Sequence, residues 1–263
     1  MLRWEILLRS QKININKGFL FYSYYIGFFY SNIFPTNIGG DIYRAYDLHN
    51  NKHISLNKNL SVIIMERLVS VASASIYVLA SFFILYKYLN LKIILGLIVI
   101  PLLMIILLLI ILKPKKFKLD KIFTKYKKIS TFQVKFEQFR NSFMEFKNKT
   151  KYIIFSLIYC LISQFLFIAC YFFAGLYSKL NLNFLTFLFI NPIITLSANI
   201  PITIGGIGVR ENMAVIVLKR FGANEPNAVI FAIVILSIIL INAIIGGILY
   251  IIKNIFYKSK GFL

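Results

Sequence analysis

Long uninterrupted runs of apolar side chains restrict this chain to a fold that lies within a lipid bilayer. Residues 91–112 carry one charge, near the start of the run, and residues 228–252 carry none. A run of about 18 apolar residues is long enough to cross the hydrocarbon core as an α-helix. Any single run could be the buried helix of a soluble protein, but several such runs together indicate an integral membrane protein.

The predicted fold is an all-α integral membrane protein with about four helices that cross the bilayer. These helices are expected near residues 60–86, 91–112, 151–177 and 227–252. Two shorter apolar segments, 18–34 and 182–199, each run into a stretch rich in proline and glycine, where a regular helix is interrupted. We expect residues 1–263 to form a single polytopic membrane domain.

The two proline- and glycine-rich breaks share one motif. Residues 35–44 read PTNIGGDIYR and residues 201–210 read PITIGGIGVR, so both fit the pattern P-x-x-I-G-G-x-x-x-R. The motifs agree at five of ten positions without a gap and lie 166 residues apart. The same shift moves the helix expected at 60–86 onto 226–252, where the last helix is expected. This agreement indicates an internal repeat.

The repeat divides the chain into two halves around a basic segment. Repeat 1 covers about 18–112, repeat 2 covers about 151–253, and the loop 113–150 lies between them. With Lys151 included, this loop carries 13 lysines and arginines against 3 acidic residues, which favours a cytoplasmic position. The 166-residue shift also places a helix ahead of Met1, so we expect the chain to be shortened at its N-terminus relative to a complete relative.

The distribution of positive charge predicts how the two halves lie in the membrane. The start and the end of the chain are basic like the central loop, so both ends are expected in the cytoplasm. Residues 18–40 and 182–221 then cannot cross completely. Each is predicted to form a re-entrant broken-helix hairpin, the first from the cytoplasmic face and the second from the outer face. The result is an inverted-topology repeat, an arrangement common in transporters.

Seven positions in the breaks are candidates for shaping a substrate site. Proline removes a backbone donor, and glycine permits positive φ angles and close approach of other groups. A helix that begins after such a break directs its positive N-terminal end into the membrane, which favours a phosphate or a carboxylate. The alternative is that the breaks serve packing alone. The candidates are Pro35, Gly39, Gly40, Pro201, Gly205, Gly206 and Gly208.

Charged residues near the breaks are the candidates for binding a headgroup. Ionisable groups within a membrane are costly, so they face partners or a wet cavity. Arg44 and Arg210 are predicted to meet an anionic headgroup from the two faces, because the planar guanidinium binds phosphate with two hydrogen bonds. A purely structural ion-pair network is the alternative. The full set is Asp41, Arg44, Glu66, Arg67, Arg210 and Glu211.

Phenylalanines in the basic loop recur at the spacing of one helix face. They are Phe132, Phe136, Phe139, Phe143 and Phe146. An amphipathic helix of this kind, with cations between its rings, fits the cytoplasmic surface of a membrane. Packing of the same face against the protein's own helices is the alternative.

Three stretches together resemble a known family. NIFPTNIGGDIYRAYDL (32–48), ERLVS (66–70) and PITIGGIGVRE (201–211) are similar to the flippase-like membrane region of lysylphosphatidylglycerol synthases, and the resemblance covers about Arg3 to Lys253. It implies transfer of an aminoacylated phospholipid or another lipid-linked substrate between leaflets, with roles for the positions named above. Bifunctional members add a soluble aminoacyl-transferase domain after the membrane part. Because this chain ends at Leu263, we do not expect lysyl transfer from charged tRNA.

We therefore predict a flippase-like protein of the cell membrane that translocates an anionic phospholipid or a lipid-linked substrate. The alternative is a membrane subunit or regulator of a separate lipid-modifying enzyme or glycosyltransferase, and a third hypothesis is an enzyme acting within the membrane. No Walker loop, Rossmann fingerprint or GxSxG motif is found, so no catalytic residue, metal or cofactor is expected. Membrane lipids are the expected partners, nucleic acid is not, and the oligomeric state is left open.

Overall fold

A computed structural model describes residues 1–34, 38–85, 102, 106, 130–197 and 203–259. Every element assigned within these residues is helical. The elements are α1 (Leu2–Ser10), α2 (Lys17–Ile33), α3 (Ile38–Lys52), α4 (Leu56–Leu85), α7 (Ser130–Met144), the 3-10 turn η3 (Glu145–Asn148), α8 (Thr150–Tyr177), α9 (Phe184–Ser197), the 3-10 turn η4 (Ile204–Gly206), α10 (Val209–Arg220) and α11 (Glu225–Ser259).

Three of the described helices are long and apolar enough to cross a membrane. They contain the spans Leu56–Ala80, Thr150–Tyr177 and Glu225–Ile255. These spans agree with the helices expected near 60–86, 151–177 and 227–252, whereas the helix expected at 91–112 falls outside the described residues. Large apolar side chains on α8 point outward, among them Leu166 and Phe173 at 63% and 65% exposure. Outward-facing apolar side chains on a helix of this length fit a surface that lies against lipid.

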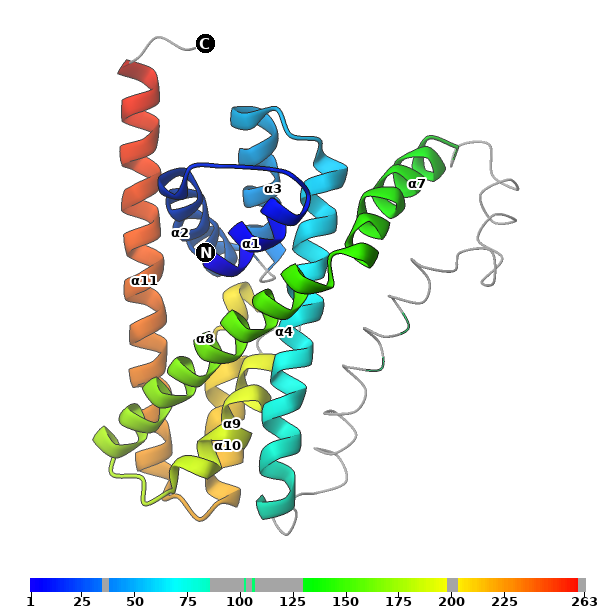
Figure 1. Cartoon of the computed structure of the whole chain (residues 1–263). Helices are drawn as coiled ribbons and strands as arrows, with labels where there is room; N and C mark the ends of the chain where they lie inside the picture. Colours follow the sequence, from blue (N-terminus) through cyan, green and yellow to red (C-terminus); the bar gives the residue numbers. More distant parts are fainter. Residues whose placement is uncertain (35–37, 86–101, 103–105, 107–129, 198–202, 260–263) are drawn as a thin grey trace.

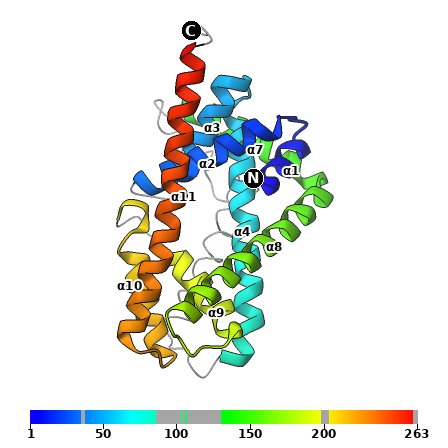
Figure 2. The same ribbon diagram turned by 90° about the vertical axis from the view of Figure 1, so that its left-hand side faces the viewer.

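Two long helices and two helical hairpins organise the molecule. Helix α4 and helix α11 run in opposite directions along its length (Figure 1). The hairpin of α2 and α3 lies at one end, and the hairpin of α9 and α10 lies at the other, as Figure 2 shows from the side. A shift of 166 residues moves α2 onto 183–199 and α4 onto 222–251, close to where α9 and α11 lie.

The identical Ile-Gly-Gly triplets of the two breaks adopt different backbone conformations. Residues 38–40 are the first turn of α3, which continues to Lys52, well past the end expected for the first hairpin at residue 40. Residues 204–206 form the 3-10 turn η4, and α10 begins only at Val209. Gly208 allows this late start because it has φ +86° at the N-cap of α10. In the first repeat its place is taken by Ile42, which stays helical.

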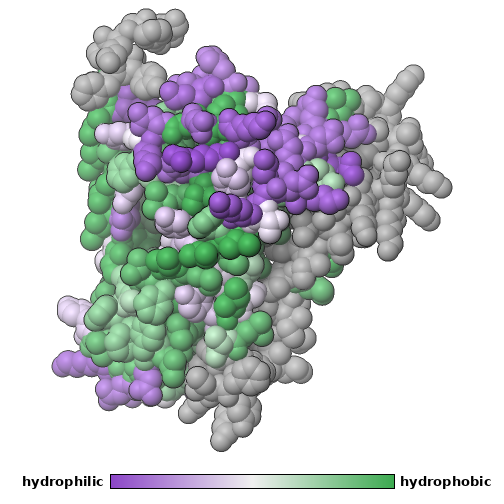
Figure 3. All heavy atoms as spheres, in the orientation of Figure 1, coloured by the Kyte–Doolittle hydropathy of each residue, from purple (hydrophilic) through white to green (hydrophobic). Residues whose placement is uncertain are grey.

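Two buried apolar clusters hold the described helices together, one near each hairpin. The first contains residues of α1, α2, α3, α4, α7 and α8, and the second contains residues of α8, α9, α10 and α11. One end of the molecule, over the first cluster, is coated with hydrophilic side chains, while a broad hydrophobic surface lies beside the second (Figure 3). This separation fits a protein that is partly embedded in lipid.

The phenylalanine face of the basic loop packs against the protein itself. Phe143 and Phe146 on α7 and η3 are 3% and 1% exposed, and Phe139 packs against the same first cluster. For these three rings the structure supports packing on the protein's own helices rather than contact with lipid. The side chains of Phe132 and Phe136 lie outside the described residues.

Candidate functional site

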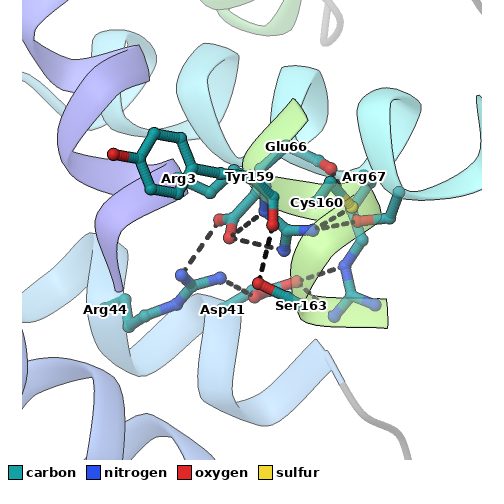
Figure 4. Close-up of polar contacts among 9 residues, drawn as sticks. Arg3, Asp41, Arg44, Glu66, Arg67, Tyr159, Cys160 and Ser163 are labelled. Carbon is teal, nitrogen blue, oxygen red and sulfur yellow. Dashed lines mark hydrogen bonds and ion pairs between the residues drawn. The ribbon is translucent and has the colours of Figure 1, made fainter. Parts of the chain in front are cut away.

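Five charged side chains from three helices form one cluster beside the first break, which we call the arginine cluster. Arg3 comes from α1, Asp41 and Arg44 from the first half of α3, and Glu66 and Arg67 from the middle of α4. Figure 4 shows the guanidinium and carboxylate groups alternating along a chain of hydrogen bonds. Residues far apart in the sequence meet here because α1 and α3 both pack against α4.

Arg44 lies at the centre of the arginine cluster and is 7% exposed. Its Nη2 donates to Asp41 Oδ1 at 2.5 Å, and its Nη1 donates to Glu66 Oε2 at 3.0 Å. The guanidinium carbon lies 4.9 Å from the Trp4 ring centroid and 5.0 Å from that of Tyr24. Such a charge is stable in a buried position only because carboxylates and aromatic faces surround it.

Arg3 and Arg67 bind the outer sides of the two carboxylates. Arg3 donates to Glu66 Oε1 from Nε at 3.1 Å and from Nη2 at 2.7 Å. Arg67 donates to Asp41 Oδ2 from Nε at 2.8 Å and from Nη2 at 2.6 Å, and its side chain is 41% exposed. Arg67 is therefore the arginine through which the cluster reaches the surface.

The charge of the arginine cluster does not balance. Three guanidinium groups face two carboxylates, which leaves one positive charge in excess among these five side chains. Burial alone would lower the pKa of Arg3, but the charge and hydrogen bond of Glu66, together with the nearby Tyr24 and Cys160, raise the pKa above its ordinary value. Arg3 therefore stays protonated at physiological pH. The cluster can attract an anion at its exposed side, next to Arg67.

Arg3 is the member of this cluster that the sequence analysis did not identify. It was grouped with the basic residues at the start of the chain, yet its Nη1 donates to Ser70 Oγ at 2.8 Å and to the Cys160 sulfur at 2.9 Å. A local signal was present. Trp4, Leu7 and Leu8 recur at helical spacing, which indicates a short helix with one buried face, and all three are at most 1% exposed.

The charges after the second break form a separate pair. Glu211 Oε2 accepts from the Gly208 N–H at 2.5 Å, and Glu211 Oε1 accepts from Arg210 Nε at 3.2 Å. The protein's own carboxylate therefore occupies the N-terminus of α10, where the sequence suggested a ligand anion. Arg210 is 8% exposed, and its Nη2 has no hydrogen-bond partner among the described residues. Arg210 is not part of the arginine cluster.

The two breaks touch each other through main-chain atoms. The Gly205 N–H donates to the Phe34 carbonyl at 3.0 Å. Gly205 has φ +60°, and a Cβ built on it would lie 2.9 Å from the Asn32 carbonyl oxygen. Both the backbone angle and the close approach therefore require glycine. Pro35 and Pro201, the first residues of the two motifs, fall outside the described residues.

The glycines of the first break serve close packing instead of positive φ. Gly39 and Gly40 are helical, and a Cβ on Gly40 would lie 2.2 Å from the Gly27 carbonyl oxygen and 2.3 Å from Ser31 Oγ. Helices α2 and α3 can approach this closely only because neither Gly27 nor Gly40 carries a side chain. Gly39 and Gly40 therefore fit the alternative that a break serves packing alone. Gly205, Gly206 and Gly208 differ, because they have positive φ angles.

Gly205→Ala is expected to destabilise the protein by about 1–3 kcal/mol, since the new methyl group strains the backbone and pushes against Asn32. Thermal unfolding in detergent, followed by far-UV circular dichroism, measures the loss. Gly222→Ala is a matched control, because Gly222 also has positive φ but a Cβ there would have nothing within 4 Å. Equal losses in the two variants would mean that the contact between the breaks contributes nothing.

These features define a class: helical membrane proteins with two broken-helix hairpins, one at each end, and buried arginines beside a break. Residues 1–247 match the family described as the lysylphosphatidylglycerol synthase TM region. The chain therefore belongs to this family. No curated protein and no solved structure is matched by the chain.

Proposed function

We propose that this protein moves an anionic phospholipid, or another anionic lipid-linked substrate, between the two leaflets of the cell membrane. The observation that carries the proposal is the positive excess of the arginine cluster, which reaches the surface at Arg67. Arginine at membrane depth is costly unless it has a partner, and a phosphate is the partner that its planar fork fits best. Membership of the family adds support, because the family is lipid-related.

We infer that the two halves form an inverted repeat whose hairpins are re-entrant from opposite faces. The opposite directions of α4 and α11 support this inference, as does the position of the hairpins at opposite ends (Figures 1 and 2). We place the hydrophilic end, which holds α1 and the end of α11, in the cytoplasm because basic segments favour that side (Figure 3). Transport then requires the two hairpins to expose the site alternately.

Within this proposal the charged residues have different roles. Arg67 is assigned to the substrate phosphate because its side chain is 41% exposed, and Asp41 orients it. Arg44 is a positioning residue, since both of its terminal nitrogens are bound to carboxylates. Arg210 is assigned to the substrate on its way to the other leaflet, because its Nη2 has no partner among the described residues.

Translocation in proteoliposomes tests the proposal. A fluorescent phosphatidylglycerol is incorporated, and a membrane-impermeant quencher reports the fraction exposed on the outer leaflet with time. Arg67→Gln is expected to slow translocation about tenfold or more, because one charge-assisted hydrogen bond contributes about 1.5–3 kcal/mol. Arg220→Gln, which alters an exposed arginine at the end of α10, is expected to leave the rate unchanged.

Two results would contradict the proposal. If well-incorporated protein moves no anionic lipid faster than empty vesicles do, the chain is better explained as a membrane subunit of a separate enzyme. If Arg67→Gln and Arg220→Gln transport equally fast, the arginine cluster has no role in binding the headgroup and is a structural network.

A further inference from the structure

Helix α2 packs against both α3 and α11, and glycines allow a close approach on each side of it (Figure 1). On the α3 side, a Cβ on Gly40 would lie 2.2 Å from the Gly27 carbonyl oxygen. On the α11 side, a Cβ on Gly246 would lie 2.3 Å from the Tyr25 carbonyl oxygen. Helices in lipid associate closely where small residues let their backbones meet. The three helices are therefore fastened at the middle of α2.

Aromatic rings join the same three helices near the end of α2. The Tyr30 ring of α2 stacks on the Tyr43 ring of α3, with centroids 4.7 Å apart. The Tyr30 ring also meets the Tyr250 ring of α11 edge to face, with centroids 5.7 Å apart. Aromatic pairs in these arrangements stabilise packing beyond the area that they bury. One tyrosine thus ties α2 to both of its neighbours.

An ion pair near the start of α2 fastens the last part of α11. Lys253 of α11 pairs with Asp47 of α3 across a groove of about 480 Å³, and its ammonium lies 5.2 Å from the centroid of the Phe19 ring on α2. The Asp47 side chain is only 4% exposed. Pulling the walls of the groove apart would leave a buried charge without its partner, which is strongly destabilising. We call α2, α3 and α11, joined in this way, the hairpin unit.

The contact between the hairpin unit and α4 is different, because two ion pairs of the arginine cluster cross it (Figure 4). Arg44 of α3 pairs with Glu66 of α4, and Arg67 of α4 pairs with Asp41 of α3. Helix α4 contains no glycine, so its side chains keep its backbone away from α3. The Arg67 side chain is 41% exposed. Water therefore reaches this boundary, and an ion pair open to water is weak enough to exchange partners.

We propose that α2, α3 and α11 move as one unit against α4, and that the moving boundary runs through the arginine cluster. Opening separates Arg44 from Glu66 and Arg67 from Asp41. Asp41 and Arg44 stay on the hairpin unit as a neutral pair, whereas Arg3, Glu66 and Arg67 keep the positive excess on the other side. A phosphate can then replace a lost carboxylate, so binding and movement depend on the same bonds. This inference rests on the proposed function and adds the part of the protein that moves.

The hairpin unit also reaches the second hairpin, because α11 is continuous from Glu225 to Ser259. The earlier half of α11 lies in the second apolar cluster together with α9 and α10. A rigid helix transmits a displacement of one of its ends to the other. Movement of the first hairpin is therefore passed on to the second, as alternate exposure of one site by two hairpins requires.

Distances between spin labels, measured by double electron–electron resonance in phosphatidylcholine nanodiscs, test the inference without any transport measurement. The native cysteines are replaced by Cys160→Ser and Cys170→Ala. Labels on cysteines introduced at Tyr46 of α3 and Ile244 of α11 report distances within the hairpin unit. Labels at Tyr46 and at Leu79 of α4 report distances across the boundary. All three labelled positions are exposed.

Two variants are expected to act on different label pairs. Arg67→Gln removes an ion pair from the boundary, so it is expected to add a population shifted by at least about 2 Å across the boundary, the size of a small helix shift. It is expected to leave distances within the unit unchanged. Lys253→Met is expected to broaden the distances within the unit, and Lys253→Arg, which keeps the cation, is expected to restore them. Lys219→Met removes an exposed ion pair and is the control, expected to change neither pair.

Three outcomes in folded variants would overturn the inference. If Arg67→Gln leaves the distances across the boundary unchanged, the boundary does not run through the arginine cluster. If Arg67→Gln shifts both label pairs alike, α11 does not move with α3. If Lys253→Met behaves as Lys219→Met does, the ion pair across the groove does not fasten the unit. Circular dichroism confirms folding. A moving boundary in a protein that translocates no lipid would defeat the proposed function alone.

Discussion

Arg44→Ala is expected to lower the free energy of unfolding by about 3–5 kcal/mol, the range observed when one partner of a buried ion pair is removed. The substitution leaves Asp41 Oδ1 and Glu66 Oε2 without their donor, and Glu66 is only 2% exposed. It also removes the cation that lies against Trp4 and Tyr24. Thermal unfolding in detergent, followed by far-UV circular dichroism, measures the change.

One further variant separates charge from geometry at Arg44, and a variant at an exposed arginine is the control. Arg44→Lys keeps the charge but cannot bind two carboxylates through one planar fork, so an intermediate loss is expected. Arg220→Ala, at an exposed position, is expected to change stability by no more than about 0.5 kcal/mol. If Arg44→Ala is as stable as Arg220→Ala, then Arg44 is not a positioning residue, and its direct role with the substrate must be reconsidered.

Gly40→Ala is expected to cost about 3 kcal/mol or to prevent folding, because the new methyl group would overlap main-chain atoms. The Cβ would lie 2.2 Å from the Gly27 carbonyl oxygen, and 2.9 Å from the Gly27 carbonyl carbon. A flexible side chain could move aside, but here the main chain of α2 must shift away from α3, at the cost of strain and lost packing. Yield of monodisperse protein and melting temperature in detergent measure the effect.

Gly18→Ala provides the matched control for Gly40→Ala. Gly18 also lies within a helix, but a Cβ there would meet only the Asn16 side-chain oxygen at 3.3 Å. The change is expected to shift stability by no more than about 1 kcal/mol, the difference in helix propensity between glycine and alanine. If both variants melt at the same temperature, the contact between α2 and α3 is looser than described.

Hydrophobic patterning predicted much of the architecture, because a membrane imposes a simple rule on length and polarity. The spans within α4, α8 and α11 follow from unbroken apolar runs, and the ends of α2 and α9 follow from the breaks that succeed them. The local conformation of the breaks could not be predicted from the shared triplet. The two breaks differ two places after the triplet, where Ile42 is helical and Gly208 has a positive φ angle.

The candidate site was predicted in composition but not in connectivity. Rules for ionisable residues in membranes selected Asp41, Arg44, Glu66 and Arg67, which the structure brings together. The same rules gave no means of deciding which carboxylate binds which guanidinium, because this depends on how α1, α3 and α4 cross. Arg3 was overlooked for that reason, and Arg210 was expected to share a substrate with Arg44 although Glu211 holds it elsewhere.

The hydrogen bond from Gly205 to Phe34 has a consequence for how the chain is made. The donor, Gly205, lies in the second half of the chain, and the acceptor, Phe34, lies near the start. The acceptor is therefore synthesised well before its donor. In the proposed re-entrant topology, the first half holds a main-chain carbonyl at membrane depth without this donor until the second hairpin is inserted, and such a group is costly in lipid. We therefore expect an interval during biogenesis in which water or the insertion machinery satisfies this carbonyl in place of Gly205.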